Sequence, residues 1–107
     1  MVEIPPPEPT FVRIETGQCK VLIFDDLRYE KRIIRDPKTG RSKTVTAMVL
    51  HVVQEDGRKV DKYFSVVSYK AQQTLYALYK RGWLFARPIR ICVYGEDYAR
   101  EYAIELV

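Results

Sequence analysis

The sequence has no apolar run long enough to cross a membrane and no leader of the secretory type at its start. Its longest apolar runs, residues 21–24 and 47–50, are strand-sized, whereas a membrane-spanning helix needs roughly 20 residues. The first residues, Met1-Val2-Glu3-Ile4-Pro5, lack the basic and apolar regions of a signal peptide. The 107 residues suffice for one domain and are too few for two. We therefore expect a single-domain, intracellular, cytoplasmic protein without a membrane partner.

Motifs for catalysis or metal binding are also missing. The sequence has no Gly-rich phosphate loop, no nucleophile elbow and no Cys–His pairing. The one histidine, His51, lies within a strand pattern and is predicted to be structural. The acidic pairs Asp25-Asp26 and Glu96-Asp97 have no partner set for a metal and are predicted as bend and turn residues. We therefore expect no enzymatic activity, no cofactor and no metal site.

Cysteine and asparagine are scarce. The two cysteines, Cys19 and Cys92, are far apart, and each lies in an apolar strand pattern. This placement favours two buried free thiols over a disulfide. A disulfide gains weight if the protein comes from a hyperthermophile. The absence of Asn and the abundance of Glu, Lys and Arg are typical of such a source.

What the chain does have is a local excess of positive charge. Seven basic residues and two acidic ones, Glu30 and Asp36, lie between residues 28 and 43. This stretch therefore carries +5 of a chain whose net charge is +4, and the remainder carries −1. Such a concentration favours a localised anionic partner. The alternative is a solvated β-ribbon whose charges provide solubility and edge protection.

The apolar pattern predicts a mainly β domain over residues 11–107, preceded by a proline-rich flexible arm at residues 1–10. Expected strands cover residues 11–14, 19–35, 43–53, 60–67, 89–94 and 101–107. Hairpin turns are predicted at residues 36–41, which contain Asp36, Pro37 and Gly40, and at residues 54–58, which contain the pair Asp56-Gly57. A bend or bulge is expected at Asp25-Asp26.

Between the third long strand and the next one, the apolar period changes to that of a helix. Ala71, Leu75 and Leu78 recur at helical spacing, so a helix is predicted over residues 69–81. Ser68 suits its N-cap, and Gly82 suits the position after its end. Trp83, which follows the helix, is predicted to be a buried cap on the core.

This order of strands, hairpins, one helix and a last hairpin matches the OB-fold, a five-stranded Greek-key barrel. The layout resembles that of the small OB-fold single-stranded-DNA-binding proteins of viruses, phages and archaea. The resemblance runs from Phe11-Val12-Arg13-Ile14 through the hairpin at residues 36–40 and Lys62-Tyr63-Phe64-Ser65-Val66 to the Ser68-capped helix and the final hairpin. It implies a single strand bound across a curved sheet by aromatic stacking and basic side chains.

Single-stranded nucleic acid requires cations for its phosphates and flat side chains for its unstacked bases. Strand alternation predicts Phe64 in the core and Tyr63 at the surface, and leaves Tyr29 open between the two. We expect Lys62 and Tyr63 to lie near the basic hairpin across the sheet. The candidate binding residues, for DNA more than RNA and with little sequence preference, are Arg28, Tyr29, Lys31, Arg32, Arg35, Lys38, Arg41, Lys43, Lys62 and Tyr63.

A protein partner is the alternative. The net charge is modest and the chain has eight tyrosines, a residue type enriched in protein interfaces. An OB-fold interaction subunit of a replication, repair or transcription assembly, or a homo-oligomer, would share these features. Among the tyrosines of the last hairpin, Tyr98 is predicted to be the most exposed.

Overall fold

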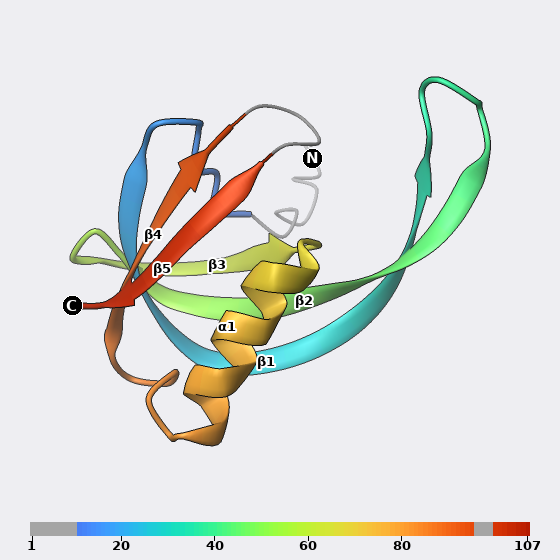
Figure 1. Ribbon diagram of the computed structural model, residues 1–107. Coiled ribbons are helices and arrows are strands. Elements are labelled where there is room, and N and C mark those ends of the chain that lie inside the picture. Colours follow the sequence, from blue (N-terminus) through green and yellow to red (C-terminus); the bar gives the residue numbers. More distant parts are fainter. Residues whose placement is uncertain (1–10, 96–99) are drawn as a thin grey trace, which may run out of the picture.

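The computed structural model describes residues 11–95 and 100–107 (Figure 1). It contains one antiparallel five-stranded sheet in the order β3-β2-β1-β4-β5, and one helix. The predicted mainly β class and the single helix between the third and fourth long strands are therefore confirmed. The elements are β1 (Cys19–Arg35), β2 (Ser42–Glu55), β3 (Arg58–Val66), α1 (Tyr69–Lys80), β4 (Pro88–Tyr94) and β5 (Glu101–Leu106). The expected proline-rich arm, the turn at Glu96-Asp97 and Tyr98 lie outside the described residues.

The sheet is open, so the closed barrel expected from the sequence is not confirmed. No ladder joins the edge strands β3 and β5 within the described residues. Residues 11–18 span the gap instead: the amide of Val12 donates to the carbonyl of Tyr63 at 2.8 Å, and that of Gly17 donates to Val93 at 2.7 Å. The strand predicted at residues 11–14 is wrong, because this segment forms only an isolated bridge between Phe11 and Tyr63. It lies along the edge of β3 without a ladder of its own.

The core lies between the curved sheet and α1. Its fully buried side chains include Leu22, Phe24, Met48, Leu50, Leu75, Leu84, Ile89 and Ile91. Phe64, predicted as a core residue, is 4% exposed and stacks on Phe24 with ring centroids 6.3 Å apart. Every strand except β5 contributes a fully buried residue, so the hydrophobic effect holds the sheet curved around one core.

The helix begins and ends where its capping residues place it. The Ser68 hydroxyl accepts from the amide of Ala71 at 3.3 Å, and Gly82, with φ of 75°, follows the C-cap. Ala71 and Leu75 are buried on the sheet. The prediction for Trp83 is wrong: it is 37% exposed, with Arg81 over its ring, because Leu84 fills the core position. Among the described residues, no helix has the length and apolar character to cross a membrane.

A bulge at Asp25, where one was predicted, changes which side chains of β1 face the core. The β1–β2 register slips between Phe24 and Asp26. Before the slip, Leu22 and Phe24 point into the core, and after it Leu27 does. Because strand side chains alternate, the even-numbered residues from Asp26 onward lie on the face away from the core.

The two cysteines form a disulfide, so the expectation of two free thiols is wrong. Cys19 and Cys92 are directly opposite each other in the β1–β4 ladder, with Cα atoms 4.0 Å apart. Cys92 is buried, whereas Cys19 is exposed. The apolar pattern correctly placed both residues in strands. It carries no information on which strands become neighbours, and that neighbourhood decides the pairing.

Beyond the core, β1 and β2 continue as a two-stranded hairpin that projects from the molecule (Figure 1). β1 pairs with β4 only over residues 19–23, and β2 meets β3 only from Met48 onward. We call residues 28–47 the ribbon and the rest of the described chain the body. At the ribbon tip, the Asp36 carboxylate accepts from the amide of Lys38, and Gly40, with φ of 70°, donates to the Asp36 carbonyl. The predicted turn chemistry is confirmed here.

Candidate nucleic-acid interface

The sheet register divides the candidate residues between two faces. Tyr63 is paired with His51, and His51 with Asp26, so these three share one face. Arg28, two residues after Asp26 in β1, lies on the same face. We call it the outer face, because the core lies on the other side of the sheet.

Four residues gather on the outer face, and we call them the outer cluster: Phe11, Arg28, Arg32 and Tyr63. The guanidinium carbon of Arg28 lies 5.1 Å from the centre of the Tyr63 ring, and that of Arg32 lies 5.6 Å from the centre of the Phe11 ring. The two rings are 6.3 Å apart and inclined by 49°. Phe11 is 44% exposed, and Tyr63 is partly buried. The cluster therefore presents two aromatic rings, each with a cation against it.

Glu30 connects the two arginines of the cluster. Its carboxylate lies 3.0 Å from a guanidinium nitrogen of Arg28 and 3.4 Å from one of Arg32. All three side chains are at least one-third exposed, so these ion pairs add little stability. Their effect is positional, because they hold both guanidinium groups over the aromatic rings.

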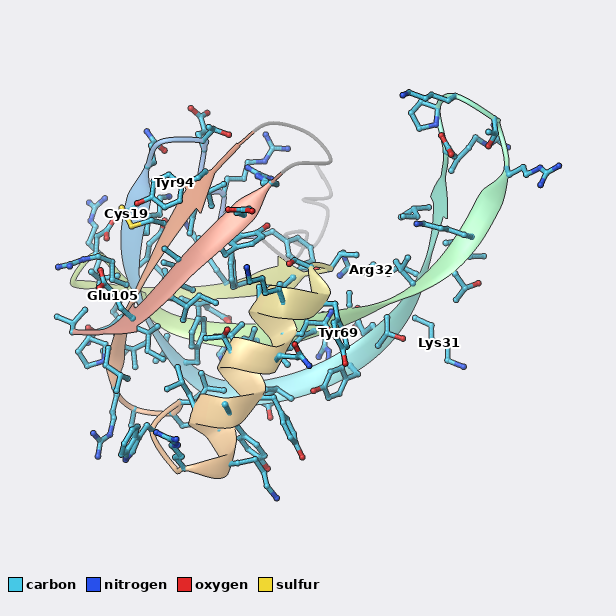
Figure 2. All side chains as sticks on the ribbon, viewed as in Figure 1. Cys19, Lys31, Arg32, Tyr69, Tyr94 and Glu105 are labelled. Atoms are coloured by element: carbon cyan, nitrogen blue, oxygen red, sulfur yellow. A yellow bond between two sulfur atoms is a disulfide. The ribbon has the colours of Figure 1, made fainter. Side chains whose placement is uncertain are left out.

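The remaining five cations of the ribbon form no ion pair with any described residue. All five belong to exposed residues: Lys31, Arg35, Lys38, Arg41 and Lys43. Figure 2 shows Lys31 and Arg32 at the base of the ribbon. Lys43, opposite Ile34, lies on the outer face, whereas Lys31 and Arg35 lie on the other face. The predicted concentration of charge is therefore present, but it is distributed over both faces of the ribbon and its tip.

At its other end, the outer face is acidic. Nδ1 of His51 lies 2.6 Å from a carboxylate oxygen of Asp25, and Nε2 lies 2.6 Å from one of Asp61. Both ring nitrogens must carry a proton to donate to both carboxylates. The hydrogen bond to Asp61, and then that to Asp25, accordingly raise the pKa of His51 above its usual value. His51 thus links β1, β2 and β3.

Two further candidate residues, Tyr29 and Lys62, do not lie beside the outer cluster. Tyr29 pairs with Met48 and therefore lies on the opposite face from Tyr63, on the side of α1. There it is 49% exposed, and burial, followed by the charge of Tyr76, raises its pKa. Tyr29 and Tyr63 therefore do not form one stacking surface.

Lys62 also lies apart from the ribbon, contrary to expectation. Its ammonium group is 2.6 Å from Glu55, whose other carboxylate oxygen is 2.6 Å from Lys20. Burial acts to raise the pKa of Glu55, but the hydrogen bonds from the two lysines together hold it below its usual value. Lys62 lies on the core side of β3, opposite Val52, and its charge is paired with that of Glu55 within the body.

Phe11 is a member of the outer cluster that the sequence pattern did not predict. The pattern predicts a short strand at Phe11, whereas the structure places its ring beside Tyr63 on the outer face. The signal available was an aromatic residue directly after the proline-rich segment, next to a basic residue. Comparison with known proteins finds no matching family model, no matching curated protein and no matching solved structure.

Proposed function

We propose that this protein binds single-stranded nucleic acid through the outer cluster and the ribbon, largely without sequence preference. The observation that carries the proposal is the placement of two arginine–aromatic pairs on one sheet face, next to a ribbon whose five further cations make no ion pair with any described residue. Unstacked bases stack on aromatic side chains, and phosphates attract cations. The preference for DNA over RNA rests on the resemblance in layout alone.

The charge distribution suggests a path for the strand. Bases would stack on Tyr63 and Phe11, while Arg28 and Arg32 contact the adjoining phosphates. The carboxylates of Asp25 and Asp61 beside His51 repel phosphates at one end of the face. The strand would therefore leave the outer cluster toward the ribbon tip, where Lys38 and Arg41 lie.

Titration of a fluorescent oligothymidylate at several salt concentrations tests the proposal. We expect binding at low salt, a linear fall of log affinity with log salt, and weaker binding of a duplex of equal length. Replacing Arg32 and Lys43 by Glu should weaken binding of all sequences alike and flatten the salt slope. Replacing Arg58 and Arg87 by Glu, at two exposed sites on the body, makes the same change in net charge and is the control.

Stacking is tested separately from charge. Tyr63→Leu and Phe11→Leu keep an apolar side chain and remove the ring, and each should reduce affinity by about 1–3 kcal/mol. Tyr94→Leu removes a ring that is 52% exposed on β4 and should leave affinity unchanged. Circular dichroism confirms that each variant is folded. No binding of the wild type at low salt, or equal affinity for duplex, contradicts the proposal.

A further inference from the structure

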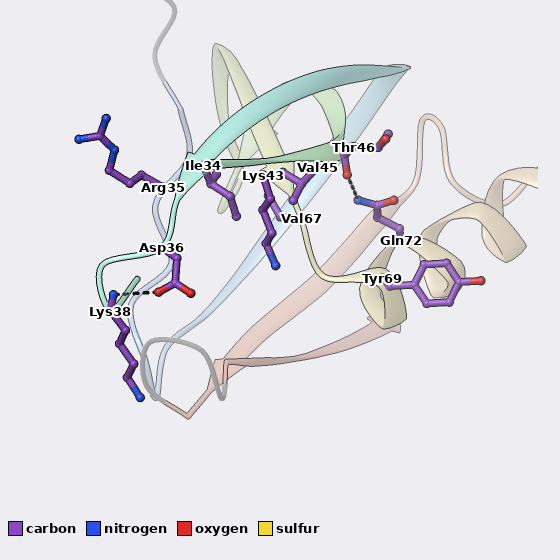
Figure 3. A pocket seen from close by; sticks show the side chains of 10 residues that line it. All are labelled: Ile34, Arg35, Asp36, Lys38, Lys43, Val45, Thr46, Val67, Tyr69 and Gln72. Atoms are coloured by element: carbon purple, nitrogen blue, oxygen red, sulfur yellow. Dashed lines mark hydrogen bonds between the residues drawn. The ribbon is translucent and has the colours of Figure 1, made fainter. Parts of the chain in front are cut away.

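A groove of about 930 Å³ lies between the ribbon and the start of α1 (Figure 3). It combines apolar and basic residues, namely Ile34, Val45 and Val67 with Arg35, Lys38 and Lys43. Tyr69, the first residue of the helix, lines it and is 74% exposed. Aliphatic side chains do not provide the flat surface on which bases stack, so this groove differs in chemistry from the outer cluster.

One wall of the groove is an unpaired strand edge. β2 pairs with β3 only from Met48 onward, and residues 42–47 have β1 as their sole partner strand among the described residues. The side-chain amide of Gln72 donates to the carbonyls of Thr46 and Val66, at 2.8 Å in both cases. The Thr46 carbonyl therefore points away from β1, into the groove.

Strand geometry shows that Thr44 has the same backbone orientation as Thr46. In an antiparallel ladder, the N–H and C=O of one residue point to the same side, and alternate residues share that side. Thr44, two residues from Thr46, thus directs its N–H and C=O toward the free edge. Of Thr44 and Thr46, only Thr46 accepts a hydrogen bond from Gln72, so the backbone groups of Thr44 are available for an added strand.

We propose that this edge binds an extended acidic peptide, which adds to β2 as a strand at Thr44. Addition of a strand to an exposed sheet edge is an established mode of peptide recognition, in which backbone hydrogen bonds supply affinity and side-chain contacts supply specificity. Alternate apolar side chains of the peptide would cover Val45 and Ile34. Its carboxylates, on the alternate face, would meet Arg35 and, at the ribbon tip, Lys38.

The charges on the ribbon decide between this occupant and a second copy of the chain. Residues 28–43 carry a net charge of +5, so pairing two ribbons edge to edge would place cations beside cations, which is destabilising. An acidic strand meets the opposite charge at the same positions. The site uses the β2 edge rather than the aromatic rings of the outer cluster, so it does not depend on the proposed nucleic-acid function.

A fluorescein-labelled peptide of about ten residues, in which Asp and Glu alternate with Val, is a suitable probe for anisotropy titration. We expect saturable binding that weakens with salt. The same peptide with an N-methyl group on every backbone nitrogen cannot donate from either edge and should bind at least tenfold more weakly. Equal binding of the two peptides would overturn the proposal.

Protein variants test the position of the added strand. Thr44→Pro removes the outward N–H without removing a β1–β2 hydrogen bond, and should reduce peptide affinity at least tenfold. Thr44→Val keeps the N–H and should bind as the wild type does. Amide shifts of Thr44 and Thr46 in NMR spectra on titration report the edge directly in the unmutated chain. Their absence at saturation would contradict strand addition.

Substitution in the outer cluster separates this proposal from the previous one, because the two ligands would share ribbon cations and would compete in either case. Tyr63→Leu should leave peptide affinity unchanged, whether or not the protein binds nucleic acid. If Tyr63→Leu weakens binding of the peptide as much as binding of oligothymidylate, the groove belongs to a nucleic-acid surface, and the peptide proposal fails. If light scattering shows a dimer that Thr44→Pro abolishes, the occupant is a second copy, and the proposal fails as well.

Discussion

Strands β1 and β2 run through both the body and the ribbon, yet the two regions differ in the burial of their side chains. In the body, Leu22, Phe24 and Leu50 of β1 and β2 are completely buried. In the ribbon, Ile33 is 76% exposed and Ile34 is 38% exposed. Strand-forming residues continue through both regions, so local propensity does not distinguish them. The difference is that the body has further strands and a helix beside β1 and β2, whereas the ribbon meets them only at its base.

This contrast separates stability from binding. A two-stranded hairpin by itself is at best marginally stable in water, so the ribbon depends on the body for its conformation. Gln72 of α1 fastens the base of the ribbon through Thr46. The ribbon in turn keeps exposed cations and a free edge, features that a buried core excludes. Changes in the body should therefore affect folding, and changes in the ribbon should affect binding.

Truncation of a core ring should have the largest effect. Phe24 is fully buried and stacks on Phe64, so Phe24→Ala should lower the free energy of unfolding by about 3–5 kcal/mol. Ile33→Ala in the ribbon should change it by less than about 0.5 kcal/mol. Urea unfolding followed by circular dichroism measures both. Similar losses for the two variants would remove the distinction between body and ribbon.

Reduction of the disulfide should have the next largest effect. Cys19 and Cys92 are 73 residues apart in sequence, and a cross-link of that span typically contributes about 2–4 kcal/mol. The double variant Cys19→Ser/Cys92→Ser should unfold at a lower temperature than the wild type. Wild type with and without reductant provides a comparison that needs no substitution. Oligonucleotide affinity per folded molecule should stay the same, because the disulfide lies in the body.

Removal of charge at the ribbon tip should lower oligonucleotide affinity and leave the stability of the fold unchanged. Lys38 and Arg41 are exposed and make no ion pair with described residues, so replacing both by Ala should change the unfolding free energy by less than about 0.5 kcal/mol. Oligonucleotide affinity at low salt should fall, and the magnitude of the salt slope should decrease by about 1.4, which is about 0.7 for each phosphate contact with a single strand. Arg58 and Arg87, replaced together by Ala, form the matched control on the body. An equal loss of affinity in the control would show that only net charge matters.

The smallest expected effect is a pH dependence at His51. Its pKa in the folded protein is raised by hydrogen bonds to Asp61 and Asp25. The resulting stabilisation is therefore fully present below the unfolded-state pKa of about 6.5 and is lost as pH rises through the folded-state pKa. Asp25 and Asp61 are largely exposed, which limits the effect to about 1 kcal/mol or less. Urea unfolding at pH 6 and pH 9 should show this loss in the wild type and not in His51→Gln.

Much of the local structure was predictable because it depends on nearby residues. The caps at Ser68 and Gly82, the turn at residues 36–41 and the bulge at Asp25 follow from side-chain chemistry and backbone preference at those positions. The concentration of cations in one hairpin was also readable from the sequence. The face of the sheet on which each side chain lies was not predictable throughout. The bulge changes which residues of β1 face the core, so the alternation that placed Tyr63 correctly could not place Tyr29.

The sequence by itself determined the strands, the helix, the turns and the location of the charge, because each depends on contacts within a few residues. Only the tertiary structure decided which strands are neighbours. That choice paired Cys19 with Cys92, placed Phe11 beside Tyr63, brought Lys20 to Glu55 and left the β2 edge open. The three contacts join residues distant in the chain, and they arise from burial of one shared core, which no local pattern encodes.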